Sequence, residues 1–265
     1  MQGACSHIIK IGGSVIAPNA TREAFRHDVV RKIGADIPGG SILVHGSGAY
    51  GKPAAVKHGY LNGVVQHELI GEILYVRQQL AELNTLFVNA VLSSGTLAFG
   101  ISAATIFSNR GSRVRFSGKP VIENCFARQM VPVIYSDFIF YRDDCLRVLS
   151  SDEIVYLLSS IYTPMNTVFA TNVDGVYRPG SSGASYGQLY RHISWEIMEQ
   201  AGTGGLHRDP LDVTGGMHDK VIYALRSARY SRNCVILNGY NSERIRAFCA
   251  GEEIMGTRVC VGGPL

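Results

Sequence analysis

The sequence predicts an α/β fold in three layers, an αβα sandwich with a mostly parallel central sheet between two layers of helices. Short apolar runs alternate along the chain with stretches of helical periodicity, and several runs lead directly into glycine-containing turns. The length of 265 residues, with 46% apolar and 17% charged residues, suits one large compact core. No low-complexity linker or internal repeat divides the chain, so we expect a single domain.

The first half of the chain begins with a strand, a helix and a second strand, the unit that places two parallel strands in one sheet. In chain order the predicted elements are a strand at 6–11, a helix at 21–33, a strand at 42–45, a long helix at 64–92, extended segments at 103–108 and 114–116, and strands at 131–135 and 138–140. We expect the long helix to be broken near Gly71 or Asn84.

The second half repeats the alternation of strands and helices. A helix is predicted to start at 151, because a serine or aspartate there precedes an apolar-periodic stretch; Asp152 is therefore a candidate helix cap as well as a candidate functional residue. The later predicted elements are a strand at 167–171, a polar loop at 178–188, a helix at 195–201, a helix at 218–231 and a strand at 234–237.

The candidate functional residues follow the apolar runs. In parallel sheets, ligands bind beyond the carboxyl ends of the strands. The segments that occupy such positions are 10–14, 45–48, 171–175 and 238–239. One crevice therefore collects two glycine turns, Lys10 and Asp174. A lysine at the end of a buried strand is costly unless it is paired, so Lys10 points to a functional role.

The glycine-rich segment 46–52 indicates a phosphate-binding turn, because glycine lets the backbone approach an anion closely. Two named phosphate motifs match it only in part. The Walker loop needs a hydroxyl where Pro53 stands, and the dinucleotide motif needs an acidic residue ending a second strand, whereas Glu68 falls in a predicted helix. A second pair of glycines precedes Lys220 at a predicted helix start, which favours phosphate contact there too.

Composition limits the other classes of function. The net charge of +4 is mild and scattered, so no nucleic acid partner is expected. The six cysteines lie far apart without a Cys-x-x-Cys pair, which argues against a zinc site or a disulfide framework and favours free thiols in a reducing compartment. The eight histidines form no metal set, so no metal-ligating side chains are expected. With no signal-like or membrane-spanning stretch, a cytoplasmic protein without a membrane partner is expected.

Five blocks in a fixed order resemble those of the amino acid kinase superfamily, and most closely those of isopentenyl phosphate kinases. The blocks are 10–14, 44–51, 150–154, 171–177 and 212–220, followed by a closing Gly-Thr-Arg-Val at 256–259. Together they span nearly the whole chain. The Val-Thr-Gly-Gly-Met-x-x-Lys stretch with the closing segment is the most specific part. Related fosfomycin kinases share the Ser-Ser-Asp form of the third block.

The resemblance implies an amino acid kinase fold and ATP-dependent transfer of the γ-phosphoryl group to an existing phosphate or phosphonate, with Mg²⁺ and without a covalent enzyme intermediate. The implied acceptor is isopentenyl phosphate, which would give isopentenyl diphosphate for isoprenoid biosynthesis. The implied assembly is a homodimer. Residues 1–150 would form the acceptor-binding lobe and 151–265 the ATP-binding lobe. The chemistry is coherent, because transfer between two anions needs cations and backbone donors that offset their repulsion.

The resemblance also implies a role for each candidate residue. Lys10 would bridge the transferring phosphoryl group, Asp152 would orient the lysines, and Lys220 would contact the ATP phosphates. The other implied ATP-binding residues are Gly12, Gly13, Ser14, Thr171, Asp174, Gly175, Tyr177, Gly215 and Gly216. The implied acceptor-binding residues are Gly46, Ser47, Gly48, Gly51 and Lys52.

Two positions depart from the pattern of isopentenyl phosphate kinases. Lys52 stands where those enzymes place a histidine, and Asn19 stands where they place a second lysine. Arg22 is close enough in the sequence to replace that lysine's charge. Both departures favour a changed acceptor. The alternatives are a phosphonate kinase, such as one that confers fosfomycin resistance, and a non-catalytic nucleotide-binding regulator. An NAD-dependent oxidoreductase is disfavoured by the position of Glu68.

Overall fold

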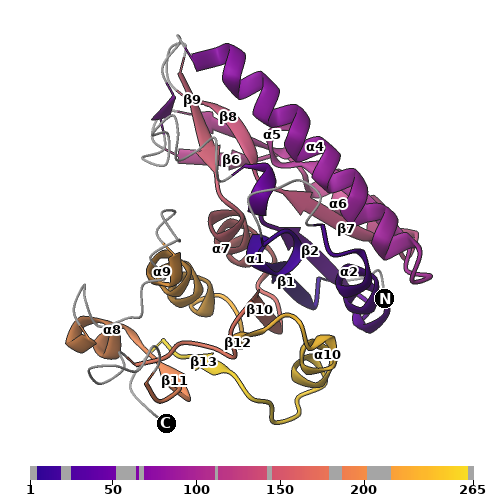
Figure 1. The fold of residues 1–265 in the computed structure, drawn as a ribbon. Helices are drawn as coiled ribbons and strands as arrows, with labels where there is room; N and C mark the ends of the chain where they lie inside the picture. The colour runs from indigo at the N-terminus through magenta and orange to yellow at the C-terminus, as the bar shows by residue number, and fades with distance from the viewer. Residues whose placement is uncertain are drawn as a thin grey trace.

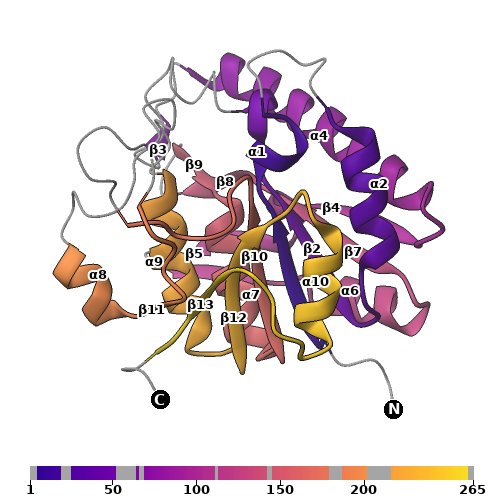
Figure 2. The ribbon, with the colours of Figure 1, turned by 60° about the horizontal axis from the view of Figure 1, so that its bottom comes forward.

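The computed structural model describes residues 5–18, 25–51, 64–65, 69–110, 113–141, 145–178, 187–201 and 216–261. Its centre is an eight-stranded sheet (Figures 1 and 2). From one edge to the other the strands are β11 (His192–Ile193), β13 (Thr257–Val259), β12 (Asn233–Asn238), β10 (Asn166–Thr171), β1 (His7–Ile11), β2 (Ser41–His45), β7 (Val131–Tyr135) and β4 (Ala98–Ser102). All neighbouring pairs are parallel except β12 and β13.

Helices cover both faces of this sheet (Figure 2). One face carries α1 (Gly13–Ile16), α2 (His27–Asp36), α4 (Ile70–Leu92) and α10 (Ser242–Cys249). The other carries α6 (Lys119–Ala127), α7 (Ser151–Tyr162) and α9 (Gly216–Ala228). Alternate side chains of β1 enter the two cores, Ile8 on the α7 face and Ile9 on the α2 face. The predicted three-layer α/β class is confirmed.

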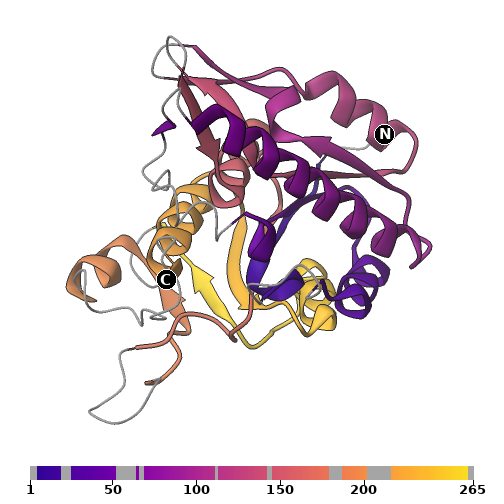
Figure 3. The ribbon, with the colours of Figure 1, turned by 45° about the horizontal axis from the view of Figure 1, so that its top comes forward.

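Smaller elements extend the half of the molecule that contains α4, the long purple helix in Figures 1 and 3. A three-stranded antiparallel sheet joins β3 (Val64–Val65), β9 (Cys145–Leu149) and β8 (Asp137–Tyr141), and β5 (Phe107–Arg110) pairs with β6 (Arg113–Phe116). Ile73, Val76 and Leu80 of α4 pack with Phe138 of β8. The remaining short elements are η2 (Gly48–Tyr50), α5 (Ala103–Ile106) and α8 (Trp195–Ala201).

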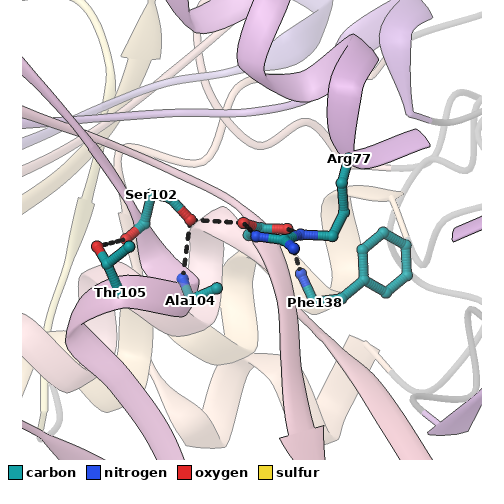
Figure 4. Close-up of polar contacts among 6 residues, drawn as sticks. Arg77, Ser102, Ala104, Thr105 and Phe138 are labelled. Atoms are coloured by element: carbon teal, nitrogen blue, oxygen red, sulfur yellow. Dashed lines mark hydrogen bonds and ion pairs between the residues drawn. The ribbon is translucent and has the colours of Figure 1, made fainter. Parts of the chain in front are cut away.

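A buried carboxylate fastens α4 to this extension. Asp137 is 2% exposed and accepts two hydrogen bonds from Arg77, at 2.8 and 3.0 Å. It also accepts one from the Ser102 hydroxyl and one from the Phe138 backbone N–H (Figure 4). The negative charge is compensated and its oxygen atoms are satisfied, so α4, β4 and β8 meet at one fixed point.

Several predicted boundaries are wrong. The helix predicted at 64–92 begins only at Ile70, continues past Gly71 and Asn84 without a break, and is preceded by the β3 strand, which pairs with β9. The segment 103–106 is a helical turn rather than extended, because the Ser102 hydroxyl caps it by accepting from the Ala104 N–H at 3.1 Å.

The predicted helix at 21–33 corresponds to α2, which runs later, from His27 to Asp36; residues 19–24 lie outside the described residues. The elements that were not predicted from the sequence include α1, β4, β9, α6, β11, α10 and β13. The helix predicted at 218–231 corresponds to α9, which begins at Gly216 and ends at Ala228. In the described part of the chain, no helix combines the length and the apolar character needed to cross a bilayer.

Candidate active site

Lys10 is a buried cation at the carboxyl end of the β1 strand. Side chains of a strand alternate between its faces, so Lys10 projects on the same face as Ile8, toward α7. The residue is 3% exposed, and its Nζ lies 2.6 Å from Oδ1 of Asp152. A buried ammonium group is costly unless it is paired, and Asp152 supplies that partner.

Asp152 stands in the first turn of α7, but it does not cap the helix. The cap is Ser150, whose hydroxyl accepts from the Glu153 N–H at 3.1 Å. The alternative interpretation of Asp152 as a helix cap is therefore wrong. Its carboxylate is directed at lysines instead. The neighbouring Glu153 does not face the lysines. It forms a bidentate ion pair with Arg147 of β9, at 3.0 and 2.8 Å.

Lys220 approaches the same carboxylate from α9. Its Nζ lies 3.9 Å from Asp152 Oδ1, and its side chain is 12% exposed. Burial lowers the pKa of Lys10 to about 7; Asp152 opposes this shift and the neighbouring Lys220 adds to it. Two lysines and one aspartate from three elements thus form a compact charged group.

Two glycine turns lie beside this charged group. One follows β1 and the other follows β2, and backbone bonds join them to neighbouring strands: Gly12 N to Ala170 O at 2.9 Å, and Gly46 N to Ile11 O at 3.0 Å. A Cβ on Gly13 would lie 2.3 Å from the backbone nitrogen of Gly48. The turns therefore pack backbone against backbone, which only glycine at position 13 allows.

The turn after β2 needs glycine for a second reason. Gly48 has a φ of +48°, in the left-handed region that side chains disfavour. Behind the turn, His45 is buried, with its ring nitrogens 3.0 Å from Gly46 O and 3.3 Å from Asn84 Oδ1. Burial lowers the pKa of His45, which keeps the ring neutral. His45 is therefore a buried polar residue with partners for both ring nitrogens.

The carboxyl ends of β10 and β12 hold the remaining candidates. Asp174 accepts hydrogen bonds from Arg244 at 2.5 Å, from Asn238 at 3.3 Å and from Tyr177 at 3.3 Å. Thr171 is the last residue of β10, and its carbonyl accepts from the Gly239 N–H at 2.7 Å. The turns predicted to share one edge of the sheet are therefore adjacent, because β12, β10, β1 and β2 are consecutive strands.

The closing Gly-Thr-Arg-Val segment has a structural role next to this edge. The Thr257 hydroxyl, fully buried, accepts from the Val176 N–H at 2.8 Å and donates to the Tyr190 carbonyl at 2.6 Å. A Cβ on Gly175 would lie 2.5 Å from that hydroxyl oxygen. Thr257 thus holds the turn that carries Asp174.

Sequence reasoning missed two contacts at the nucleotide side of the predicted site. Arg244 of α10 pairs with Asp174, and the Tyr240 hydroxyl donates to the Ser14 carbonyl at 2.9 Å. Both residues belong to a segment that looks like an ordinary loop and surface helix. Their partners are 70 and 226 residues away, so no local pattern could have identified them.

Some of the remaining predicted residues are described in the structure and others are not. Gly216, with a φ of +55°, begins α9, and Gly51 packs against the Ser47 side chain. Lys52, Gly215, Asn19 and Arg22 lie outside the described residues. Among the residues that are described, no group of three or more histidine, cysteine, aspartate or glutamate side chains is arranged to hold a metal ion.

Comparison with curated proteins finds relatives that match nearly the whole chain. Isopentenyl phosphate kinase of Methanothermobacter thermautotrophicus is 27% identical over 264 residues, covering 95% of this chain and 98% of that protein. The enzyme of the same name from Thermoplasma acidophilum is 27% identical over 242 residues, covering 90% and 94%.

Solved structures share the fold. The T. acidophilum isopentenyl phosphate kinase product complex has a TM-score of 0.76 at 22% identity, covering 96% of this chain and 99% of that one. Carbamate kinase of Giardia lamblia bound to AMP-PNP has a TM-score of 0.64 at 13% identity, covering 99% and 100%. The family model described as the amino acid kinase family matches residues 7–238. The chain therefore belongs to the amino acid kinase family.

Proposed function

We propose that this protein is an ATP-dependent kinase that transfers the γ-phosphoryl group to the phosphate of a small acceptor, with isopentenyl phosphate as the acceptor and isopentenyl diphosphate as the product. The observation that carries the proposal is the convergence of Lys10 and Lys220 on one oxygen of Asp152, beside two glycine turns. The curated relatives named isopentenyl phosphate kinase support the choice of acceptor.

The reaction joins two anions, and the site addresses their repulsion. An oxygen of the acceptor phosphate attacks the γ-phosphorus, the bond from that phosphorus to the β–γ bridging oxygen breaks, and ADP leaves. No general base is needed, because the attacking oxygen is already ionised at neutral pH. Protonated Lys10 would lie against the transferring phosphoryl group and stabilise the charge on its oxygens, while Asp152 fixes the direction of the ammonium group.

The glycine turns divide the two substrates between them. The N–H groups of Gly12 and Gly13 are assigned to the γ-phosphate, and those of Gly46, Ser47 and Gly48 to the acceptor phosphate. A Cβ on Gly46 would lie 2.7 Å from the Gly13 nitrogen, so the two turns are in direct contact. Phosphates held on these turns would be neighbours, which reduces the entropic cost of bringing the reacting atoms together.

Mg²⁺ fits this site as a companion of ATP. Mg²⁺ in kinases is bound mainly by phosphate oxygens and water. The acidic side chains of this cleft, Asp152 and Asp174, already pair with Lys10 and Arg244, so the triphosphate itself would hold the ion. When bound, the ion would neutralise charge on the β- and γ-phosphates. The protein itself would contribute Lys220 and the N–H groups of the Gly12–Gly13 turn to binding of the triphosphate.

A phosphonate acceptor is the second candidate. The sequence Ser150-Ser151-Asp152 has the form shared with fosfomycin kinases, and Lys52 replaces the histidine typical of isopentenyl phosphate kinases. A lysine offers a phosphonate a point charge in place of a single hydrogen bond. Both proposals transfer the same γ-phosphoryl group from ATP. They differ only in the anion that accepts it.

Parallel assays of the purified protein with ATP and Mg²⁺ test the proposal. ADP release is measured with isopentenyl phosphate, with fosfomycin and with a panel of alkyl phosphates, and ³¹P NMR identifies the phosphoanhydride product. We expect isopentenyl phosphate to give a diphosphate. Turnover with fosfomycin and not with isopentenyl phosphate would show that the acceptor is a phosphonate. ATP binding without turnover on any acceptor would favour a non-catalytic nucleotide-binding protein.

The division into an acceptor lobe at 1–150 and an ATP lobe at 151–265 is part of the same proposal. The Gly46–Gly48 turn and α4 belong to the first, and Asp174 and Lys220 to the second. We also propose a homodimer, which size-exclusion chromatography with light scattering would test directly.

A further inference from the structure

Arg244 makes a contact that the reaction as described does not use. It lies in α10, and its Nη1 is 2.5 Å from Oδ1 of Asp174. The same oxygen accepts from the Asn238 amide at 3.3 Å, and the other oxygen accepts from the Tyr177 hydroxyl at 3.3 Å. Of these three donors, only Arg244 carries a charge that balances the carboxylate.

We propose that Arg244 is a positioning residue of the nucleotide site, which neutralises Asp174 so that the triphosphate of ATP meets no unpaired negative charge. The inference rests on the proposed ATP-binding role of this cleft. Arg244 acts through Asp174 and is not assigned a contact with ATP.

The position of Asp174 makes its charge relevant to the phosphates. The carboxylate is hydrogen-bonded to Asn238, the last residue of β12, and the Gly12–Gly13 turn follows β1, two strands away in the sheet. Two strand spacings correspond to about 10 Å. A charge at this distance from a triphosphate, in a partly shielded site, still interacts with it at physiological salt. The Asp174 side chain is 31% exposed, so water shields it only in part.

The charge balance of the cleft explains why neutralisation is needed. Lys10 and Lys220 bring two positive charges when protonated, and Asp152 cancels one of them. Arg244 and Asp174 cancel each other. The described site therefore retains a single positive charge for a highly anionic ligand, and loss of Arg244 would remove that surplus.

The carboxylate stays ionised in this environment. The hydrogen bond from Arg244 lowers the pKa of Asp174, partial burial opposes the shift, and the bonds from Asn238 and Tyr177 add to the lowering. Asp174 is thus a permanent negative charge at neutral pH. The competing interpretation is that the ion pair only attaches α10 to the turn after β10. In that case the effect of removing Arg244 would not depend on the charge of the ligand.

Binding measurements on a set of variants separate the two interpretations. Isothermal titration calorimetry gives the Kd of a non-hydrolysable ATP analogue, of ADP and of adenosine. For Arg244→Ala we expect about tenfold weaker binding of the analogue, a smaller loss for ADP and no change for adenosine. The double variant Arg244→Ala/Asp174→Asn restores the charge balance, so its Kd for the analogue should return to within about threefold of the wild-type value.

The matched control is Arg246→Ala, two residues along the same helix. Arg246 is exposed and pairs with Asp36 at 3.3 Å, away from Asp174. We expect all three Kd values to be unchanged in this variant. Asp174→Asn alone keeps Arg244 and removes one negative charge, so it should bind the analogue more tightly than the wild type, which tests the inference even if Arg244→Ala does not fold.

Three results would overturn the inference: equal weakening of analogue and adenosine by Arg244→Ala, no rescue by the second substitution, or a tenfold loss in Asp174→Asn alone. Failure of the proposed function looks different. If isopentenyl phosphate is not the acceptor, the wild type still binds the analogue and the comparison of variants stands; if the wild type binds no nucleotide, the proposed function itself fails.

Discussion

The ammonium group of Lys10 contacts Oδ1 of Asp152 at 2.6 Å, although 142 residues separate the two in the chain. Lys10 is the penultimate residue of the buried strand β1, and Asp152 lies in the first turn of α7, which covers that strand, so the pair connects two layers of the fold. The ion pair gives a buried cation a fixed direction while leaving it next to the glycine turns. Our predictions follow from this arrangement and from the contacts around it.

Replacement of Lys10 by alanine should abolish most of the phosphoryl transfer. Removing one preorganised cation from a charge-stabilising site costs about 100-fold or more in kcat. The fold should persist, which circular dichroism would verify. Lys119→Ala is the matched control, because Lys119 is 66% exposed and pairs only at the surface, with Glu123. Normal turnover in Lys10→Ala would remove Lys10 from the mechanism.

The pH dependence of stability should report the buried lysine. Burial lowers the pKa of Lys10 to about 7, whereas the unfolded chain keeps that proton up to about 10.5. Between these values the unfolded state binds more protons, so Lys10 makes the free energy of unfolding rise with pH from about 7 to about 10. Below pH 7 this stabilisation is lost.

Urea denaturation of the wild type and Lys10→Met across that pH range would measure the effect. Methionine does not titrate, so the variant should lack the contribution, and the stability difference between the two proteins should change with pH. Parallel curves for the two proteins would show that Lys10 keeps its ordinary pKa in the folded state.

Alanine at position 13 should separate the two glycine turns. Its Cβ would lie 2.3 Å from the Gly48 nitrogen and 2.6 Å from the Gly48 Cα, and backbone cannot yield as a side chain can. We expect a lower Tm and a large loss of activity. Gly71→Ala is the control, because nothing lies within 4 Å of its added Cβ and alanine favours a helix by about 0.5–1 kcal/mol. An active, stable Gly13→Ala protein would contradict the assigned geometry.

Asp137→Ala should destabilise the protein by about 3 kcal/mol or more, because it leaves Arg77 and other donors without their buried acceptor. Chemical denaturation monitored by fluorescence would measure the change. Asp28→Ala serves as a comparison, since that side chain is 88% exposed and its ion pair with Arg31 is 3.8 Å long. It should shift stability by no more than about 0.5 kcal/mol. Equal effects of the two substitutions would contradict the structural role of Asp137.

The strand cores and turns were predictable because their signals are local. Strands β1, β2 and β10 are buried on both faces, so each reads as a nearly continuous apolar run. The glycines that follow β1 and β2 mark close backbone approach in the sequence itself. Boundaries failed where tertiary contacts decide them: Val64–Val65 is a strand only because β9 pairs with it, and a solitary apolar stretch cannot show that.

The sequence by itself determined the α/β class, the glycine turns that follow β1 and β2, and the choice of Lys10, Asp152 and Lys220 as candidate site residues. Only the tertiary structure decided that Lys10 and Lys220 both face one carboxylate oxygen of Asp152. It also decided that Ser150 rather than Asp152 caps α7, and that Arg244 forms an ion pair with Asp174. The physical reason is range. Backbone propensities and turns act between neighbours in the chain, whereas charge pairing acts between groups that the packing of layers brings together.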